Sequence, residues 1–556
     1  PDMKTFKFSY ILTAIIFFSS CGIDQMATKY DTVNFTTTPP VLQAHGGKVS
    51  LNLDANFPAK YFAKKATVDF TPVLVYNEGE TAFKTIIIQG EEATGGEATI
   101  FNATGGGFKY QDKITYTDKM LNARLEIRAT AKQKDKEKVL GPVNIANGVI
   151  ATSTRVKDNE DLANNNHGYE HETILEESAT IYFLVNQSNI RTTEKSDADI
   201  TELKKFSKKG YKTHSIEIIS YASPEGAVNM NDNVSEKRMK STLNYTKRLL
   251  RSLKVEGARN NDLYTESSVG EDWEGFESLI KDSDIKDKRK INNIVNSISD
   301  VEVREQQIRD LAEIYDAIED NVLPQLRKAT IIIRSYEPKR SDEEIASLSI
   351  TNPNELSVEE LLFSATLADN EVDQTKIYNK AVELHNDWRG YNNIACIHIA
   401  NGDLNSAMDY LNKATSIKEE NSDISTNKGI IAARIGELAN AQVLFDKANT
   451  TERNQAILDI RQGEYNKAIR YFKKSKSHNA TLAKLMNGSN NVACNESTAE
   501  CYYLNSIAKV RSGDNDGAIN MLKKAINANS KFKSEAVNDY EFYNLRSDSN
   551  FIDLTK

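Results

Sequence analysis

The sequence of 556 residues lacks two features that mark large classes of proteins. After the first twenty residues it has no apolar run long enough to span a bilayer, which excludes a membrane-spanning helix there. It also has no block of basic residues, because 70 Lys and Arg are outnumbered by 79 Asp and Glu, for a net charge of −9. Since nucleic-acid binding depends on clustered positive charge, we expect no nucleic-acid partner.

Catalytic and cofactor signatures are also missing. The sequence has no serine nucleophile elbow, no HExxH and no phosphate-binding loop, and its seven histidines are scattered. His167 and His171 have a spacing that would bind a metal on a helix, with Glu170 and Glu172 beside them. Gly168 and the asparagines before it favour a solvated loop instead. We therefore expect no enzyme activity, no metal and no cofactor.

Cysteine is scarce, with four in the chain. Cys396 is expected to be a small, buried apolar residue in a helix. Cys494 and Cys501, seven positions apart, either form a disulfide between a loop and the helix that follows it or remain free. Such sparse use of cysteine is compatible with an exported protein.

The first residues have the pattern of a targeting segment. Lys4 and Lys7 precede a short apolar stretch at residues 10–18. The Phe-Ser-Ser-Cys sequence that ends at Cys21 resembles the lipobox of bacterial lipoproteins. The resemblance implies a signal peptide at residues 1–20, acylation of Cys21, and a lipid anchor in the outer membrane with the protein facing the periplasm. A plain secretory peptide with an incidental cysteine is the alternative.

The next two segments are a predicted linker and a predicted all-β domain. Residues 21–43 are rich in Thr and Pro and are predicted to be a flexible tether. Within residues 44–160, residues 48–54 alternate strictly, and residues 67–76 and 84–89 are rich in β-branched side chains. Glycine-rich turns separate about seven such runs, enough for an immunoglobulin-like sandwich. We expect this domain to act as a spacer or a protein contact.

A strand, a loop and a helix then follow in one register. Residues 215–221 alternate as a strand, Pro224 and Gly226 interrupt a loop, and an amphipathic helix opens at Ser235. This order resembles the OmpA-like C-terminal domain, the module that binds peptidoglycan in Gram-negative envelopes. The residues that keep the family's spacing are Tyr221, Ala222, Ser223 in place of the family's Asp, Gly226, Asn231, Ser235 and Arg238.

The resemblance implies a ligand. In the family, the Asp and the Arg clasp the two charged ends of diaminopimelate in the peptidoglycan stem peptide. Arg238 would hold the carboxylate, Ser223 offers only a neutral oxygen, and Glu225 would supply the missing negative charge. The site implied by the resemblance is therefore Ser223, Glu225, Gly226, Asn231 and Arg238. Otherwise Arg238 is an ordinary surface arginine and Glu225 is a turn residue.

The same resemblance predicts an α/β domain of OmpA-like type over residues 177–338, with the order βαβαβ–β. A helical insertion at residues 274–327 separates the third strand from the last, and its best helix is predicted at residues 300–321. An insertion of this size beside the ligand loop would cover the loop or provide a surface for a partner.

An internal repeat follows. The residues Ala395, Gly402, Ala407, Leu411 and Ala414 return thirty-four positions later as Gly429, Gly436, Ala441, Phe445 and Ala448. This period and this order of small and large residues resemble tetratricopeptide repeats. Residues 355–530 are therefore predicted to form a solenoid, followed by a C-terminal tail at residues 531–556. We expect the concave face of the solenoid to bind a protein partner.

Together these features predict a multidomain chain with an N-terminal all-β sandwich, a central α/β OmpA-like domain and a C-terminal all-α solenoid. The function expected first is a non-enzymatic outer-membrane lipoprotein that links the membrane to peptidoglycan and recruits a protein partner. The alternative is a scaffold subunit of a secretion, assembly or fimbrial machine, in which the OmpA-like fold makes protein contacts without binding peptidoglycan. The neutral Ser223 favours this alternative.

Overall fold

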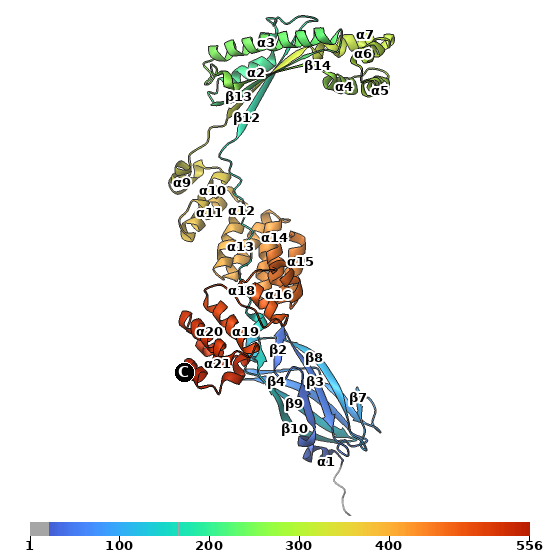
Figure 1. Ribbon diagram of the computed structural model, residues 1–556, viewed down its shortest axis with the longest axis vertical. Coiled ribbons are helices and arrows are strands. Elements are labelled where there is room, and N and C mark those ends of the chain that lie inside the picture. Colours follow the sequence, from blue (N-terminus) through green and yellow to red (C-terminus); the bar gives the residue numbers. More distant parts are fainter. Residues whose placement is uncertain (1–21, 165) are drawn as a thin grey trace, which may run out of the picture. The chain divides into compact units, whose positions relative to one another are not determined.

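The computed structural model describes residues 22–164 and 166–556, which form two compact units (Figure 1). The first unit combines the described residues up to Asn166 with Asn370–Lys556, and the second unit is His167–Asp369. The chain of the second unit is therefore inserted into that of the first. The predicted signal peptide, the lipobox and Cys21 lie outside the described residues.

The N-terminal part of the first unit is a β-sandwich. Its strands are β1 (Asn34–Thr37), β2 (Leu42–His45), β3 (Lys48–Phe57), β4 (Thr67–Tyr76), β5 (Gly79–Ala82), β6 (Ile86–Gly90), β7 (Ala98–Ile100), β8 (Gly106–Thr115), β9 (Arg124–Gln133), β10 (Lys136–Asn147) and β11 (Val149–Ile150). One sheet has the order β1-β3-β2-β11, with β8 paired to β3. The other has the order β10-β9-β4-β6-β7, with β5 paired to β4.

The sequence pattern explains how the two sheets face each other. Along β3, Val49, Leu51 and Leu53 are buried while the residues between them are more exposed, as the strict alternation predicts. These side chains share one hydrophobic core with residues of the other sheet, among them Phe70 and Ile127. The prediction of a mostly-β N-terminal region is confirmed.

The prediction of a flexible tether at residues 21–43 is wrong over its described part. Helix α1 (Gly22–Thr28) buries Ile23 and Met26 in the core of the sandwich. The hydroxyl of Tyr61 donates a hydrogen bond to the carbonyl oxygen of Met26 at 3.0 Å, and β1 pairs with β3. The burial of these apolar side chains outweighs the linker-like composition of the Thr- and Pro-rich stretch.

An α/β fold makes up most of the second unit. Its elements are β12 (Ile174–Tyr182), α2 (Ala198–Ser207), β13 (Thr213–Ala222), α3 (Val228–Ser252), β14 (Tyr264–Glu271) and, after a helical insertion, β15 (Lys328–Tyr336). The sheet order is β12-β15-β13-β14, with β13 and β14 parallel and the other neighbours antiparallel. Leu203 of α2 and Leu250 of α3 share a core with Ile218 and Ile331 of the sheet. The unit ends with α9 (Asp342–Thr351) and α10 (Val358–Thr366).

The insertion between β14 and β15 has a hydrophobic core of its own. Its helices are α4 (Trp273–Asp282), α5 (Lys288–Ser297), α6 (Val301–Arg309), α7 (Ala312–Asn321) and α8 (Leu323–Leu326). Phe276, Ile291 and Ile318 are among the buried residues that hold these helices together. The single helix predicted at residues 300–321 is wrong, because Leu311 has a non-helical backbone (φ −81°, ψ 54°) that separates α6 from α7.

The C-terminal part of the first unit is a solenoid of helices. They are α11 (Glu371–His385), α12 (Trp388–Ala400), α13 (Leu404–Ile417), α14 (Ser422–Arg434), α15 (Leu438–Ala448), α16 (Glu452–Arg461), α17 (Tyr465–Phe472), α18 (His478–Met486), α19 (Ala499–Arg511), α20 (Asn515–Ala528), α21 (Lys531–Asn538) and α22 (Ser549–Thr555). The small residues of the repeat let neighbouring helices pack closely. A Cβ atom on Gly429 would lie 2.5 Å from the ring of Phe445, so only glycine lets these two helices approach so closely.

The boundaries of the solenoid differ from the prediction at both ends. Residues 355–369, predicted to open it, belong to the second unit. Residues 531–556, predicted to be a tail, fold as α21, a 3₁₀ helix at Tyr540–Leu545 and α22. Phe532, Phe542 and Phe551 are buried against α19 and α20, because the last helix pair of a solenoid would otherwise expose an apolar face.

Candidate functional site

The loop between β13 and α3 holds the predicted ligand residues, and its acidic residue is already paired. Glu225 accepts two hydrogen bonds from the guanidinium of Arg327, from Nε at 2.7 Å and from Nη2 at 2.9 Å. Ser223 donates to Oε1 of Glu225 at 2.6 Å. The side chains of Glu225 and Arg327 are 16% and 12% exposed. The charge that was expected to replace the family's Asp is thus engaged inside the fold.

Arg238 lies on α3 and is one of the largest of the almost completely buried side chains, with 2% of its surface exposed. Its guanidinium donates to three main-chain carbonyls, those of Gln187 (3.0 Å), Tyr221 (2.9 Å) and Leu184 (3.2 Å). Burial, followed by the neighbouring Arg327, lowers the pKa of Arg238 to about 10, and Glu225 opposes this shift. Arg238 is therefore not the surface arginine of the alternative interpretation. It ties α3 to the ends of β12 and β13.

The helical insertion covers the same loop. The N–H of Gly226 donates to Glu305 of α6 at 3.2 Å, and Asn231 donates to Glu271 at 2.8 Å. Burial, followed by nearby Glu271, raises the pKa of Glu305 to about 7. The structure thus brings all five predicted residues to one place and adds Glu271, Glu305 and Arg327. For Glu305 and Arg327 the sequence signal was the expectation that the insertion covers the loop, and Glu271, at the end of β14, had no such signal.

The two histidines with metal-like spacing pack around an aromatic ring. The rings of His167 and His171 lie 5.1 and 4.9 Å from that of Phe363, and Nε2 of His171 lies 3.1 Å from Asp342. Tyr169 stacks on the same ring at 4.8 Å. Among the residues that the structure describes, no cluster of His, Cys, Asp and Glu is arranged to hold a metal ion.

The predicted partner-binding face of the solenoid is occupied by a segment of the same chain. We call residues 155–163, which leave the sandwich after the 3₁₀ helix Thr152–Thr154, the strap. The strap is extended, and a row of buried asparagines contacts its main chain. These asparagines are Asn392 on α12, Asn427 on α14, Asn454 on α16 and Asn479 on α18. We call these four asparagines, together with Arg434, Arg453 and Arg461 (described below), the strap site.

Each amide in this row bonds the main chain of the strap. Asn479 accepts the N–H of Lys157 at 2.8 Å and donates to its carbonyl at 2.9 Å. Asn454 bonds Asp161 in the same way, at 2.7 and 2.9 Å. Asn392 donates to the carbonyl of Ala163 at 2.8 Å. The amides therefore recognise an extended backbone, with little dependence on its side chains.

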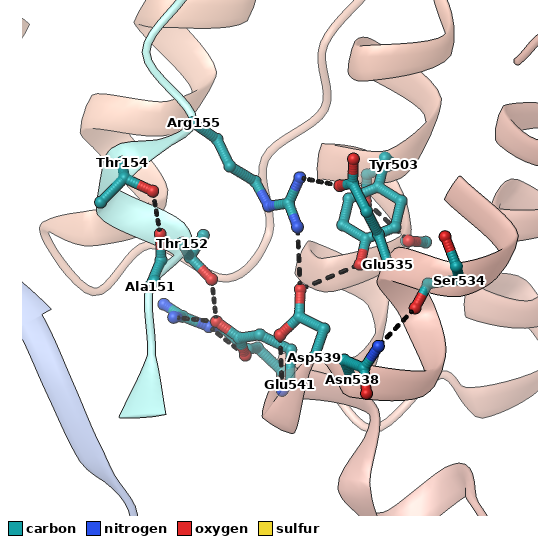
Figure 2. A network of polar contacts seen from close by, with 12 residues as sticks. Ala151, Thr152, Thr154, Arg155, Tyr503, Ser534, Glu535, Asn538, Asp539 and Glu541 are labelled. Carbon is teal, nitrogen blue, oxygen red and sulfur yellow. Dashed lines mark hydrogen bonds and ion pairs between the residues drawn. The ribbon is translucent and has the colours of Figure 1, made fainter. Parts of the chain in front are cut away.

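The last residues of the chain, 531–556, which we call the C-terminal cap, fix the start of the strap (Figure 2). Figure 2 shows the guanidinium of Arg155 between Glu535 and Asp539, at 3.0 and 3.1 Å. The same guanidinium lies 4.1 Å from the ring centre of Tyr503, whose hydroxyl donates to Asp539 at 2.9 Å. The hydroxyl of Thr152 donates to Glu541. Residues 531–556 thus hold the point where the sandwich passes into the strap.

The three described cysteines all lie in the solenoid. Cys494 and Cys501 form a disulfide between the loop after α18 and the start of α19. Cys396 is a free, buried thiol, as expected, and burial raises its pKa to about 12. Its sulfur lies 3.2 Å from the amide nitrogen of Asn427, so it packs beside the strap site rather than in a purely apolar core.

Comparison with known families identifies the repeat. Residues 389–421 match the family model of the tetratricopeptide repeat. The solenoid is therefore of tetratricopeptide type, a fold that typically acts as a non-enzymatic scaffold for protein–protein interaction. No curated protein matches the chain. Among the described residues, none of the helices combines the length and the apolar character needed to cross a membrane.

The solved structures that match the chain are distant in sequence and in structure. A tetratricopeptide repeat protein from Parabacteroides merdae is 18% identical, with a TM-score of 0.29, over 35% of this chain and 88% of that one. YrrB, described as a TPR protein with an unusual peptide-binding site, is 16% identical, with a TM-score of 0.20, over 34% and 94%. The APC/C hetero-tetramer Cut9–Hcn1 is 11% identical, with a TM-score of 0.23, over 66% of this chain and 56% of that one.

Proposed function

We propose that the protein is a non-enzymatic, lipid-anchored scaffold of the bacterial outer membrane, and that its second unit is an OmpA-like module that contacts protein rather than peptidoglycan. The tetratricopeptide repeats support the scaffold role. The observation that carries the second part is the pairing of Glu225 with Arg327. A zwitterionic stem peptide needs one free charge of each sign, but Glu225 is ion-paired and Arg238 is bonded to three carbonyls.

A peptidoglycan tether is the second candidate, and one observation favours it. Among residues 22–164 and 166–556, no carboxylate forms an ion pair with Arg238, so its hydrogen bonds go to neutral carbonyls. A stem-peptide carboxylate that reached the guanidinium would complete its pairing. This candidate requires the insertion to move away from the loop, since Glu305 bonds Gly226.

Sedimentation with purified peptidoglycan separates the two candidates. We expect the parent protein to stay in the supernatant at low salt. The matched variant is Ser223→Asp, which restores the acid of the OmpA-like family and tests whether that acid creates peptidoglycan binding. If the parent protein sediments and a soluble diaminopimelate-containing stem peptide releases it, the tether is right and the scaffold proposal is wrong for this unit.

Partner recruitment is tested with the full chain in detergent-solubilised membranes. We expect the same proteins to co-purify with and without muramidase digestion of the wall, because a scaffold holds its partners directly. Loss of every partner after digestion would show that the wall, and not the protein, brought them together.

The lipid anchor at Cys21 is part of the same proposal. Cys21→Ala should move the protein from the membrane to the soluble fraction, and intact-mass analysis of the parent should show acyl chains at that position. Because α1 begins at Gly22 and is packed into the sandwich, a lipid on Cys21 would hold the sandwich against the bilayer with almost no slack. A Cys21→Ala protein that stays membrane-bound would exclude this anchor.

A further inference from the structure

The strap site recognises more than a main chain, because it also contains arginines that face the acidic residues of the strap. Glu160 lies between Arg434, whose Nη2 is 2.7 Å from the carboxylate, and Arg461, whose Nη2 is 3.6 Å away. The side chain of Glu160 is only 1% exposed. Arg461 also pairs with Asp158, two residues earlier in the strap. Two acids at alternate positions of an extended chain therefore meet the same pair of arginines.

A third arginine extends this pattern. Arg453 lies 3.7 Å from Asp161, which also accepts a hydrogen bond from Thr451 at 3.0 Å. The first helix of each of three consecutive helix pairs (α14, α16 and α18) thus contributes a side chain that bonds a carboxylate or the main chain of the strap. Arg434 belongs to α14, Arg453 and Arg461 to α16, and Asn479 to α18.

The strap site is built for an occupant. Its asparagines are at most 2% exposed and the side chain of Arg434 is 9% exposed, so the groups that bond the strap would lose those partners if it left. Arg434 would keep its bond to the carbonyl of Ile399, and Asn427 would keep its bond to Asn392. The strap offers few apolar anchors in return, with Val156 and Leu162 only partly buried. The binding is therefore polar and charge-specific, which is the kind of contact that another acidic, extended segment can reproduce.

We propose, on the basis of the scaffold function above, that the strap site is a binding site for an extended acidic segment of a partner protein. The strap is its built-in occupant and keeps the site closed. The matching partner segment carries two acids at alternate positions, like Asp158 and Glu160, and no proline where the amides bond the main chain. A segment on the same chain has an effective concentration of about 1 mM or more, so a partner enters only when the strap is loosened.

The test uses the full chain and a labelled synthetic peptide of residues 155–163 added in trans. In the parent protein the strap blocks the site, and we expect no peptide binding at micromolar concentration. The double variant Asp158→Lys/Glu160→Lys repels its own strap from Arg434 and Arg461. We expect this variant to bind the labelled peptide at least tenfold more tightly than the parent does.

Two matched controls locate the binding. A peptide in which the acids at 158 and 160 are replaced by lysine should not bind, because it would be repelled by the same arginines. Asn427→Ala and Asn454→Ala, added to the double variant, should abolish binding of the acidic peptide. Circular dichroism and size-exclusion chromatography establish that each variant is folded. If the charge reversal prevents folding, Asp158→Asn/Glu160→Gln, which keeps the side-chain volumes, replaces it.

Two outcomes would overturn the proposal. One is a folded strap variant that binds the acidic peptide no better than the parent does. The other is equal binding of the acidic and the lysine-containing peptides. Either result would show that the strap is a structural part of the solenoid and that the site takes no partner. Neither result would affect the co-purification of partners by other surfaces of the full chain, so failure here is distinguishable from failure of the scaffold function.

Discussion

The side chain of Asn427 bonds both main-chain groups of Ala163. Its Oδ1 accepts the N–H of Ala163 at 3.0 Å, and its Nδ2 donates to the carbonyl of Ala163 at 3.0 Å. An amide that bonds both groups of one residue replaces the bonds that a neighbouring β-strand would make. Because three asparagines repeat this contact along the strap, the solenoid and the segment that leaves the sandwich form one hydrogen-bonded structure.

Loss of one of these amides should loosen the strap locally. In Asn454→Ala, the N–H and the carbonyl of Asp161 lose their partners, at a cost of about 1–3 kcal/mol. We expect faster hydrogen exchange in a peptic fragment that covers residues 155–163, measured by mass spectrometry. Asn405→Ala is the control, because Asn405 is exposed on α13, and it should leave that exchange unchanged. Equal protection in both variants would mean that other contacts hold the strap.

Arg238 should be essential for the stability of the second unit. Arg238→Ala removes three hydrogen bonds and a buried side chain between α3 and the ends of β12 and β13, and we expect a loss of about 2–4 kcal/mol in the free energy of unfolding, measured by chemical denaturation. Arg238→Lys keeps the charge but not the fork of donors, so an intermediate loss is expected. Arg248→Ala, at an exposed position of the same helix, should change stability by less than about 0.5 kcal/mol. Similar small effects at both positions would contradict the tying role.

The contact between α6 and the ligand loop should depend on pH. The pKa of Glu305 is raised from its usual 4.5 to about 7 by burial and by Glu271. The folded chain therefore keeps a proton that the unfolded chain releases in this window. The stability that this group contributes is fully present below about pH 4.5 and is lost as the pH rises through about 7.

Glu305→Gln removes this titration while it keeps the size of the side chain. We expect the variant to be more stable than the parent at pH 8, by about 1–3 kcal/mol, and nearly equal to it at pH 4.5. Chemical denaturation at both pH values measures the difference. Glu302→Gln, at an exposed position of the same helix, should give no such difference. The raised pKa would be contradicted if the second unit of the parent became more stable, relative to that of Glu305→Gln, as the pH rose from 5 to 8.

The C-terminal cap should behave as part of the core. Phe542 is fully buried, and we expect Phe542→Ala to lower the free energy of unfolding by about 3–5 kcal/mol and to lower the melting temperature of the first unit. Tyr543, the next residue, is 56% exposed, and Tyr543→Ala is the control, with an expected cost of less than about 1 kcal/mol. If both variants melt at the same temperature as the parent, residues 531–556 do behave as a tail.

Local patterns in the sequence predicted the parts of the fold that depend on neighbours in the chain. The thirty-four-residue period identified the helix pairs, because small residues such as Gly429 must recur wherever two helices cross closely. The alternation along β3 identified the core face of the sandwich, because successive side chains of a strand point to opposite faces. The period records contacts between neighbouring helices, and the alternation records which face of β3 is buried, whatever residues cover that face.

The errors fall where a segment is held by distant residues. The strap has the polar composition of a linker, and its partners lie 229 to 384 positions further along the chain. Arg327, which pairs with Glu225, is 102 positions away. No local spacing encodes such contacts. The break at Leu311 has no Gly or Pro to mark it, so the continuous apolar stripe at residues 300–321 predicts a single helix.

The strap also sets an order of events during synthesis. Residues 155–163 emerge from the ribosome before the whole second unit, and Asn479, which holds Lys157, follows 322 residues later. At about 5–20 residues per second, the interval is on the order of 15–60 s. Until Asn392 is made, 229 residues after Ala163, the strap has none of its asparagine partners in the nascent chain. The solenoid therefore has to close around a segment that was made long before it. The first unit is completed only when the last helices of the chain have been translated.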